Sequence, residues 1–365
     1  SAGVASPRAD AEQLAAAVLD LPRGRLPLVT GLSQEQAARL RELVDLRARR
    51  IPLQHLTGVA GFRRLDLAVG PGVFIPRPET ETVVEWAIQA LRAERVERPL
   101  CVDLCSGSGA IALALADEVP GAVVHAVEAE PEALAWLRRN VERTGLPVTV
   151  HAADVGIARR DARGEDARPR AGGAVPSATE ALAACAGRVD LVISNPPYLP
   201  DDERDLVEPE VGEHDPAAAL WGGPDGLDGP RAVFAVARSL LRPGGLLVVE
   251  HSDRHGRAAV ELLLAAGGWT EVADHPDLAG RDRFVTARRS PDGPTSHPDS
   301  HPGRVDEGRH RTGQHQTGQH QTGQHQTGQH QTSQHQTGQH RTGRHRTGQM
   351  GRPALTRPAL TRPAR

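Results

Sequence analysis

The sequence predicts an α/β protein with a doubly wound, mostly parallel sheet of seven strands. From about residue 77 to residue 289, short apolar segments typical of strands alternate with longer amphipathic segments typical of helices. Such alternation implies a sheet whose strands run mostly in parallel, with helices covering both faces. The first strand leads into a glycine-rich turn, which indicates that this edge of the sheet approaches a ligand.

Residues 1–70 are predicted to form a small helical domain that ends in a hairpin linker. DAEQLAAAVLDL and SQEQAARLRELVDLRARR carry apolar residues at spacings of three and four, and Ser33 with Gln36 matches a capping box. An apolar stripe, interpreted as core packing, is formed by Leu40, Leu43 and Val44. FRRLDLAVGPGVFIP then alternates and breaks, which predicts a short hairpin before the next domain.

The predicted elements of residues 71–289 follow in the order that a doubly wound sheet requires. Strands are expected at residues 100–104, 122–128, 148–154, 189–195, 244–251, 269–274 and 282–289. Helices are expected at residues 79–91, 109–119, 131–145, 230–241 and from Arg257 onward. In this architecture ligands bind beyond the carboxyl ends of the strands, at the point where the strand order reverses.

Residues 290–365 are predicted to be a low-complexity, disordered tail. A five-residue repeat, TGQHQ, runs from about Thr312 to His340, and such polar sequence buries too little apolar surface to offset the entropy of ordering. The eight histidines spaced every fifth residue from His310 to His345 fit either flexible metal binding or an expanded repeat with no role. Because this spacing fixes no ligand geometry, we expect no metal site.

Composition predicts a cytoplasmic protein without a membrane segment. Basic and acidic residues nearly balance, at 43 and 46. Residues 291–365 hold ten arginines against four acidic residues, so the tail carries +6 and residues 1–290 carry −9. The three cysteines form no disulfide framework and no CxxC pair, which fits a reducing compartment. We find no apolar run long enough to cross a bilayer and no signal peptide.

The first strand of the sheet ends in a turn that suits a nucleoside. In DLCSGSGA, Asp103 at the strand end is followed by small residues, namely Cys105, Ser106, Gly107, Ser108 and Gly109. The chain can approach a ligand closely here and then begin a helix. Glu128 ends the next strand about 20 residues later, where a carboxylate can accept hydrogen bonds from both ribose hydroxyls.

The surrounding residues argue against a dinucleotide and favour a cationic nucleoside. Ile111 and Ala112 fill the place of the third glycine of the dinucleotide-binding pattern. Asp103 would repel a phosphate but would favour a positively charged ligand such as S-adenosylmethionine. The end of the third strand offers Asp154 to an adenine amino group and Val155 to the adenine ring. Asp154 is equally consistent with a solvated loop acid.

The fourth strand ends in NPPY, which predicts a rigid turn that binds a planar NH₂ group. The chain has one tyrosine and two asparagines, and Tyr198 lies three residues after Asn195. Pro196 and Pro197 fix their own φ angles and donate no backbone hydrogen bond. The Asn195 side-chain oxygen and the Pro196 carbonyl are therefore expected to converge on one NH₂ group. Tyr198 offers a face on which a planar amide or base can stack.

Several segments together resemble the protein N5-glutamine methyltransferases that modify bacterial peptide chain release factors. They are FIPRPETE (74–81), VDLCSGSGAIALALA, AVEAEPEAL, VDLVISNPPY, HDPAAALWGGPDGL and LRPGGLLVVEH. The resemblance covers roughly residues 10–289. NPPY alone is shared with enzymes that methylate amino groups of DNA, whereas FIPRPETE is much more specific to this family.

The resemblance implies a class I methyltransferase fold, S-adenosylmethionine as donor, and the glutamine of the Gly-Gly-Gln motif in release factors as substrate. It also implies that the N-terminal helical domain helps to grip the release factor. Residues 105–109 match the donor-binding turn, and the glutamine-binding motif is matched unchanged by Asn195, Pro196, Pro197 and Tyr198. Three positions depart from the usual pattern, with Cys105 for Gly, Glu128 for Asp and Val155 for a larger apolar residue. Residues 156–187 form a longer insertion than the family implies.

Two alternatives remain open at this point. An adenine-N6 methyltransferase of DNA or RNA would hold the same NH₂ group on a flipped base. The acidic residues 1–290 argue against it, since phosphate binding favours a basic groove, but the +6 tail could compensate. A non-catalytic RNA- or metal-binding protein acting through the tail is the second alternative. We expect a monomeric enzyme without a stable nucleic-acid complex, which positions the amide nitrogen rather than using a general base, and His251 is assigned a structural role.

Overall fold

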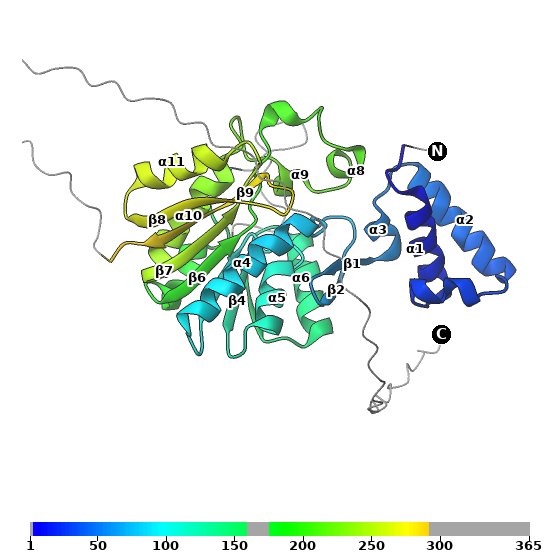
Figure 1. The fold of residues 1–365 in the computed structure, drawn as a ribbon, viewed down its shortest axis with the longest axis horizontal. Coiled ribbons are helices and arrows are strands. Elements are labelled where there is room, and N and C mark those ends of the chain that lie inside the picture. Colours follow the sequence, from blue (N-terminus) through cyan, green and yellow to red (C-terminus); the bar gives the residue numbers. More distant parts are fainter. Residues whose placement is uncertain (1–2, 159–174, 292–365) are drawn as a thin grey trace, which may run out of the picture. The chain divides into compact units, whose positions relative to one another are not determined.

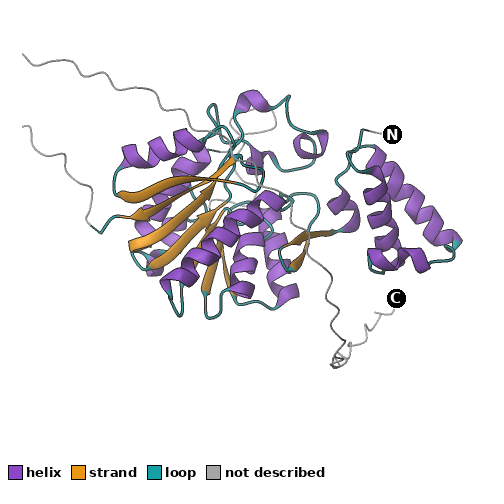
Figure 2. Ribbon diagram, viewed as in Figure 1, coloured by secondary structure: helices purple, strands orange, loops and turns teal. Residues whose placement is uncertain are grey.

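The structure, a computed structural model, describes residues 3–158 and 175–291 (Figure 1). Segment 159–174 of the predicted insertion and the predicted tail from residue 292 lie outside the described residues. The described residues fall within one compact unit. Figure 2 shows a helical N-terminal part followed by one large sheet flanked by helices.

The N-terminal part is helical, as the sequence predicts. Its elements are α1 (Pro7–Leu19), the 3-10 helix η1 (Arg23–Leu28), α2 (Gln34–Ala48) and α3 (Leu53–Thr57). Ser33 Oγ accepts a hydrogen bond from the Gln36 backbone at 3.1 Å, and the Gln36 side chain accepts one from the Ser33 backbone at 2.9 Å. The predicted capping box is therefore confirmed.

The core of this N-terminal part is small and consists of leucines from three helices. Leu14, Leu43 and Leu53 are buried together, and Leu40 packs against them. Val44, which we predicted to share this stripe, is 41% exposed and lies outside the core. The prediction was wrong for Val44 because α2 packs on its neighbours through a narrower strip, in which only Leu43 is fully buried.

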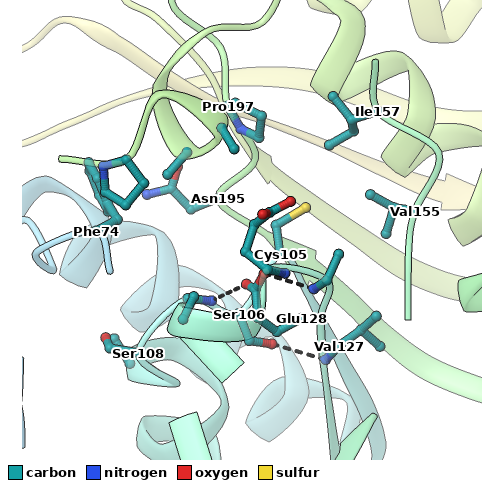
Figure 3. Close-up of a pocket in the computed structure, with 18 of the residues that line it drawn as sticks. Phe74, Cys105, Ser106, Ser108, Val127, Glu128, Val155, Ile157, Asn195 and Pro197 are labelled. Carbon is teal, nitrogen blue, oxygen red and sulfur yellow. Dashed lines mark hydrogen bonds between the residues drawn. The ribbon is translucent and has the colours of Figure 1, made fainter. Parts of the chain in front are cut away.

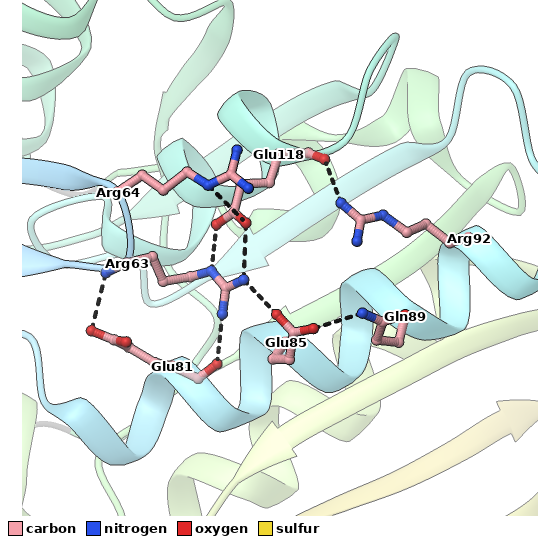
Figure 4. A network of polar contacts seen from close by, with 7 residues as sticks. All are labelled: Arg63, Arg64, Glu81, Glu85, Gln89, Arg92 and Glu118. Atoms are coloured by element: carbon pink, nitrogen blue, oxygen red, sulfur yellow. Dashed lines mark hydrogen bonds and ion pairs between the residues drawn. The ribbon is translucent and has the colours of Figure 1, made fainter. Parts of the chain in front are cut away.

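A hairpin of β1 (Val59–Phe62) and β2 (Leu65–Ala68) follows, somewhat earlier in the chain than predicted. Arg63 in its turn has φ +52 and is anchored to the helices α4 (Pro78–Glu94) and α5 (Ala110–Glu118). Its guanidinium pairs with Glu118 and, at 2.6 Å, with Glu85, while its backbone N–H donates to Glu81 at 3.0 Å (Figure 4). Because Arg63 is only 12% exposed, this polar cluster fixes the hairpin to the sheet domain.

The large sheet has seven strands in the order β5-β4-β3-β6-β7-β9-β8. The strands are β3 (Leu100–Leu104), β4 (Val123–Glu128), β5 (Val148–Ala152), β6 (Val189–Ser194), β7 (Leu241–Glu250), β8 (Trp269–Pro276) and β9 (Asp282–Arg289). All pairs are parallel except those made by β9, which is antiparallel to both neighbours. The predicted fold class is confirmed.

Helices cover both faces of the sheet and form two separate cores. Apolar residues of α4, α5 and α6 (Pro131–Thr144) pack on one face. The other face is covered by α7 (Ala178–Ala181), α10 (Asp228–Leu240) and α11 (Gly256–Ala266). The remaining short helices are η2 (Ala183–Cys185), η3 (Asp201–Glu203), α8 (Pro209–Gly212) and α9 (Ala217–Leu220).

The strand order reverses between β3 and β6, which are adjacent in the sheet although β4 and β5 follow β3 in the chain. Leu104 and Ser194, the last residues of these strands, are partners in the register, and Ser194 Oγ donates to the Leu104 carbonyl at 2.6 Å. Cys105 and Asn195 therefore leave the sheet side by side. This is where a doubly wound fold binds its ligand.

Candidate active site

A cavity lies beyond the carboxyl ends of β3, β4, β5 and β6 (Figure 3). Predicted site residues that line it are Cys105, Ser106, Gly107, Ser108, Glu128, Asp154, Val155, Asn195 and Pro197. Predicted site residues that lie outside the lining are Asp103, Gly109, Pro196 and Tyr198. In Figure 3, Phe74 and Asn195 lie on one side of the cavity, and Val155 and Ile157 lie on the opposite side.

The loop after β3 is held in place by its own backbone and by Ser106. Ser106 Oγ donates to the Asp103 carbonyl at 2.9 Å and accepts from the Val127 backbone at 3.1 Å, which ties the loop to β4. Gly107 has φ +55, and a Cβ atom there would meet nothing within 4 Å, so this backbone is open to a ligand. Gly109 has φ +88, and a Cβ there would lie 2.5 Å from Leu137.

Cys105 adopts the backbone conformation that glycine favours, with φ +60. The resemblance places glycine at this position, and the structure shows why, since a side chain is strained in the left-handed region. Burial raises the pKa of the Cys105 thiol well above its usual range. The residue therefore serves as a neutral wall of the cavity rather than as a nucleophile.

Glu128 directs its carboxylate back onto the backbone around it. Oε2 accepts from the Gly107 N–H at 2.8 Å, and Oε1 accepts from the N–H groups of Ala129 and Glu130, both at 2.7 Å. Burial raises the pKa of Glu128, and these backbone donors oppose the rise. A carboxylate offers about four lone-pair positions, so the described contacts leave room for about one more donor. The carboxylate lines the cavity and can accept a ligand hydroxyl there.

Asp103 lies beneath the loop and does not line the cavity. It is fully buried, and Oδ2 accepts from the Ala112 N–H at 3.1 Å at the start of α5. Oδ1 is buried without a hydrogen-bond partner among the described residues. Burial raises the pKa of Asp103 to about 8. Its contacts support the shape of the loop.

Asp154 and Val155 follow β5 and line the cavity, and Val155 lies on the side opposite Asn195 (Figure 3). The Asp154 backbone is pinned by residues 176–178, since its N–H donates to the Pro176 carbonyl at 3.0 Å and its carbonyl accepts from Ala178 at 2.7 Å. Asp154 Oδ1 accepts from the Gly156 N–H at 2.8 Å. The two residues therefore hold a fixed place on this wall.

Asn195 has a defined side-chain partner that the sequence did not reveal. Its Nδ2 donates to Thr80 Oγ1 at 3.1 Å, and Thr80 lies in the first turn of α4 with only 3% exposure. One Nδ2 hydrogen is used by Thr80, which orients the amide, and Oδ1 has no hydrogen-bond partner among the described residues and can accept from a ligand. Pro196 and Pro197 are buried, and Pro197 lines the cavity.

Tyr198 is oriented by a carboxylate rather than by the cavity. Its hydroxyl donates to Glu250 Oε1 at 3.0 Å, and Glu250 is the last residue of β7. Burial raises the pKa of Glu250 to about 7 and that of Tyr198 well above its usual range. The predicted stacking face of Tyr198 is not part of the cavity wall, so this role stays a prediction.

A second wall joins two segments that are far apart in the sequence. Phe74 and Pro76 line the cavity from one segment, and Pro216, Ala218, Ala219 and Trp221 line it from the other. Arg77 connects them by an ion pair with Asp215, whose side chain is fully buried. Burial raises the pKa of Asp215 to about 6 although Arg77 lowers it. The pair therefore fixes one side of the cavity.

Three glycines pack directly against the backbone of the NPPY turn. A Cβ at Gly229 would lie 2.2 Å from the Pro197 carbonyl oxygen, and one at Gly222 would lie 2.8 Å from the same atom. A Cβ at Gly226 would lie 2.5 Å from the Tyr198 carbonyl oxygen. Only glycine permits this approach, so WGGPDGLDG forms the back of the turn.

The other asparagine, Asn140, supports the loop after β3. It is fully buried on α6, and its Nδ2 donates to the carbonyls of Ala68 at 3.0 Å and Ser108 at 2.9 Å. Its Oδ1 accepts from the Ala68 N–H at 2.7 Å. Asn140 thus ties the hairpin to the loop. The scarcity of asparagine was the signal that could have found it.

Among the described residues, none of those that line the cavity is a histidine. His251 is fully buried and bonds to the Ser252 carbonyl at 2.8 Å and to Asp274 at 2.9 Å, so the predicted structural role fits. Within residues 3–158 and 175–291, no cluster of three His, Cys, Asp or Glu side chains suits a metal ion. The tail histidines lie outside the described residues.

Comparisons with known proteins agree along most of the chain. Residues 1–58 match the family profile described as the PrmC N-terminal domain, and residues 64–165 match the methyltransferase small domain. A release factor glutamine methyltransferase of Streptomyces coelicolor is 50% identical over 289 residues, which cover 79% of this chain and 93% of that protein. One from Mycolicibacterium smegmatis is 47% identical over 290 residues, with 79% and 93% covered. The Mycobacterium tuberculosis protein of that description is 45% identical over 293 residues, with 79% and 87% covered.

Proposed function

The chain belongs to the release factor glutamine methyltransferase family, and from that premise we propose which of its residues hold the substrate and the donor. The enzyme methylates the side-chain amide nitrogen of a glutamine in release factors and depends on S-adenosylmethionine. We assign the glutamine of a Gly-Gly-Gln motif to the side of the cavity formed by Asn195. The observation that carries this assignment is the Asn195–Thr80 hydrogen bond, which leaves the amide oxygen of Asn195 for the substrate.

The donor side of the cavity fits a nucleoside. The Glu128 carboxylate lines it and can accept a ribose hydroxyl, and the open backbone of Gly107 allows close approach. Val155 and Ile157 offer an apolar wall to a purine ring, and Asp154 offers an acceptor beside them. When bound, S-adenosylmethionine supplies a methyl group on a positively charged sulfur. Asp103 does not line the cavity, and it supports the donor side by holding the loop after β3 in shape.

The chain's own contribution to the reaction is to position a weak nucleophile. An amide nitrogen is a poor nucleophile because its lone pair is delocalised, so orientation must supply much of the rate, up to about 7–11 kcal/mol in well-aligned systems. Asn195 Oδ1, from the cavity wall, accepts one hydrogen of the substrate NH₂. The Pro196 carbonyl is the proposed acceptor of the other, although Pro196 is not among the residues that line the cavity. Together the two acceptors set the direction of the substrate nitrogen. Both bonds strengthen as positive charge develops on that nitrogen, to about 1.5–3 kcal/mol each.

Membership of this family also bears on the binding partners and the cellular location of the enzyme. We propose that release factors dock as protein substrates, that the N-terminal helices take part in docking, and that the enzyme is a cytoplasmic monomer. Ion pairs connect these helices to the segment after the NPPY turn, because Arg47 pairs with Glu210 at 2.8 Å and Arg50 pairs with Glu208 at 2.7 Å. Within the described residues, no helix combines the length and apolarity that a membrane span needs.

A substitution at Asn195 tests the assignment directly. Asn195→Ala should abolish transfer of label from the donor to a release factor, while the affinity for S-adenosylhomocysteine stays within about threefold of wild type, because the residue acts on the amide. Duplex DNA, offered in place of the release factor, should take up no label. Retained methylation by Asn195→Ala, or an equal loss of donor binding, would contradict the assignment.

A further inference from the structure

After the NPPY turn the chain forms a loop, residues 199–221, whose two ends meet beside the cavity. The Leu199 N–H donates to the Leu220 carbonyl at 2.8 Å, and the Leu199 carbonyl accepts from the Gly222 N–H at 2.8 Å. Ends that close in this way are typical of a compact surface loop. Because Leu199 directly follows Tyr198, the loop begins and ends at the turn that is proposed to hold the substrate.

The last part of the 199–221 loop is a wall of the cavity. Four of its residues line the cavity, namely Pro216, Ala218, Ala219 and Trp221. Trp221 is 5% exposed, and the Arg204 guanidinium, from the first half of the loop, lies over its ring at 4.1 Å from the centroid. The position of this wall therefore depends on how the rest of the loop is held.

The middle of the loop is held by the N-terminal helices. Glu210 lies in α8 and its side chain is only 18% exposed. Its carboxylate pairs with Arg47 of α2 at 2.8 Å and with Arg50, which follows α2. Four residues further on, the His214 ring meets the His55 ring of α3 in an edge-to-face arrangement, with centroids 6.5 Å apart. The N-terminal helices therefore contact the loop at two points.

Glu210 is the contact that we expect to matter most, because two cations share one largely buried carboxylate. Arg47 is 13% exposed and also pairs with Asp10 of α1 at 2.7 Å, so its position is set within the N-terminal part. Burial raises the pKa of Glu210, but hydrogen bonds from Arg50 and Arg47 outweigh this effect and hold the pKa at about 2. Glu208 also pairs with Arg50, at 2.7 Å, but it is 75% exposed, and such exposed pairs contribute little.

We propose that Glu210 is a positioning residue through which the N-terminal helices hold the 199–221 loop, and with it the cavity wall at residues 216–221, in place beside the substrate. The inference rests on the proposed placement of the glutamine at the side of the cavity formed by Asn195. Glu210 itself does not line the cavity, so it acts only through the loop. The helices that are proposed to dock the release factor thereby also complete the active site.

The matched variants Glu210→Gln and Glu208→Gln test this in the full-length enzyme. Both remove one negative charge from the same loop and keep the shape of the side chain. We expect Glu210→Gln to lower kcat at saturating release factor by about tenfold, because even a displacement of the wall by less than about 1 Å disturbs the alignment of the substrate. The affinity for S-adenosylhomocysteine should stay within about twofold, and Glu208→Gln should keep kcat within about twofold.

The division between kcat and KM separates this role from direct docking. If Glu210 only gripped the release factor, its loss would raise KM and leave kcat unchanged. A Glu210→Gln enzyme with a raised KM and the wild-type kcat would therefore overturn the inference. Equal losses of kcat in Glu208→Gln and Glu210→Gln would also overturn it, because the net charge of the loop rather than the buried pair would then be responsible.

Trp221 reports on the wall in the absence of any substrate. The chain has four tryptophans, so Trp221→Phe identifies the part of the fluorescence that comes from Trp221. In the free enzyme, Glu210→Gln should make this part at least about twofold more sensitive to quenching by acrylamide, because a loop held less firmly opens more often. Unchanged quenching, or an increase that persists in the Trp221→Phe background, would overturn the inference.

Arg50→Met tests whether Glu210 acts through its ion pairs. This variant removes one of the two cations that Glu210 binds. In its background Glu210→Gln should lower kcat by only about threefold, instead of about tenfold, because part of the connection to the N-terminal helices is already broken. Losses that multiply independently would contradict a role through these pairs.

The two proposals fail in different ways. If Asn195→Ala is inactive but Glu210→Gln keeps kcat within about twofold of wild type, the inference is wrong and the role of Asn195 stands. If Asn195→Ala methylates release factors normally, the proposed role of Asn195 is wrong and the inference falls with it.

Discussion

Gly229→Ala should strongly reduce methylation although it adds a single methyl group to a residue that does not line the cavity. Gly229 is the second residue of α10, and its backbone is not in the left-handed region, so on helix propensity alone alanine would stabilise by up to about 1 kcal/mol. The new Cβ, however, would lie 2.2 Å from the Pro197 carbonyl oxygen and 3.1 Å from the Pro196 Cβ. Packing against the turn therefore decides the outcome.

The size of the effect follows from these distances. Ordinary contact begins at 3.4 Å, so the new atom falls about 1.2 Å short of the room it needs. Neither neighbour is the free end of a flexible side chain, so the NPPY turn or α10 must move. Overpacking of this kind costs about 1–3 kcal/mol, which leaves a net loss of stability of about 0–2 kcal/mol. A shift of about 1 Å in a positioning group costs on the order of a hundredfold in rate.

The assay compares Gly229→Ala with Gly61→Ala. Gly61 also lies outside the left-handed region, and a Cβ there would meet nothing within 4 Å, so it controls for the substitution itself. We expect Gly229→Ala to remain folded by thermal denaturation but to lose about a hundredfold in kcat on a release factor, with Gly61→Ala near wild type. If the kcat of Gly229→Ala stays within about threefold of the wild-type kcat, methylation does not require the NPPY turn to be packed so closely.

Further outcomes follow from buried charge and from the tail. Arg77→Met should lower the free energy of unfolding by about 3–5 kcal/mol in denaturant titrations, because it leaves the fully buried Asp215 carboxyl without its cation. The double variant with Asp215→Leu should recover most of the lost free energy of unfolding. Burial raises the pKa of Glu250 from 4.5 to about 7, so the free energy of unfolding of the wild type falls as pH rises through that interval. Glu250→Gln lacks this loss, so between about pH 4.5 and 8 its free energy of unfolding should rise relative to that of the wild type by up to about 3 kcal/mol. Deleting residues 292–365 should leave kcat unchanged.

The sequence predicted best those features that depend on residues close together in the chain. The seven strands, the loop at residues 105–109 and the NPPY turn each carry their signal within a few positions. Because parallel strands end at one edge, the order of elements was enough to bring the loop and the turn together. The capping box of Ser33 is another local signal, and it was confirmed.

The supporting residues escaped prediction because they depend on contacts across the chain. Thr80 lies 115 residues from Asn195, and Glu250 lies 52 residues from Tyr198. One threonine in the first turn of a helix, or one glutamate at a strand end, has no local pattern that marks it. Val44 was misplaced for the opposite reason, since its spacing fitted a stripe that the tertiary packing made narrower.

A crystal structure of the enzyme with S-adenosylhomocysteine and a Gly-Gly-Gln peptide would test the central claim most directly. We predict that the glutamine NH₂ lies within hydrogen-bonding distance of both Asn195 Oδ1 and the Pro196 carbonyl, with Asn195 Nδ2 still on Thr80. A glutamine amide held by other residues, or an Asn195 amide turned so that its nitrogen faces the peptide, would contradict it.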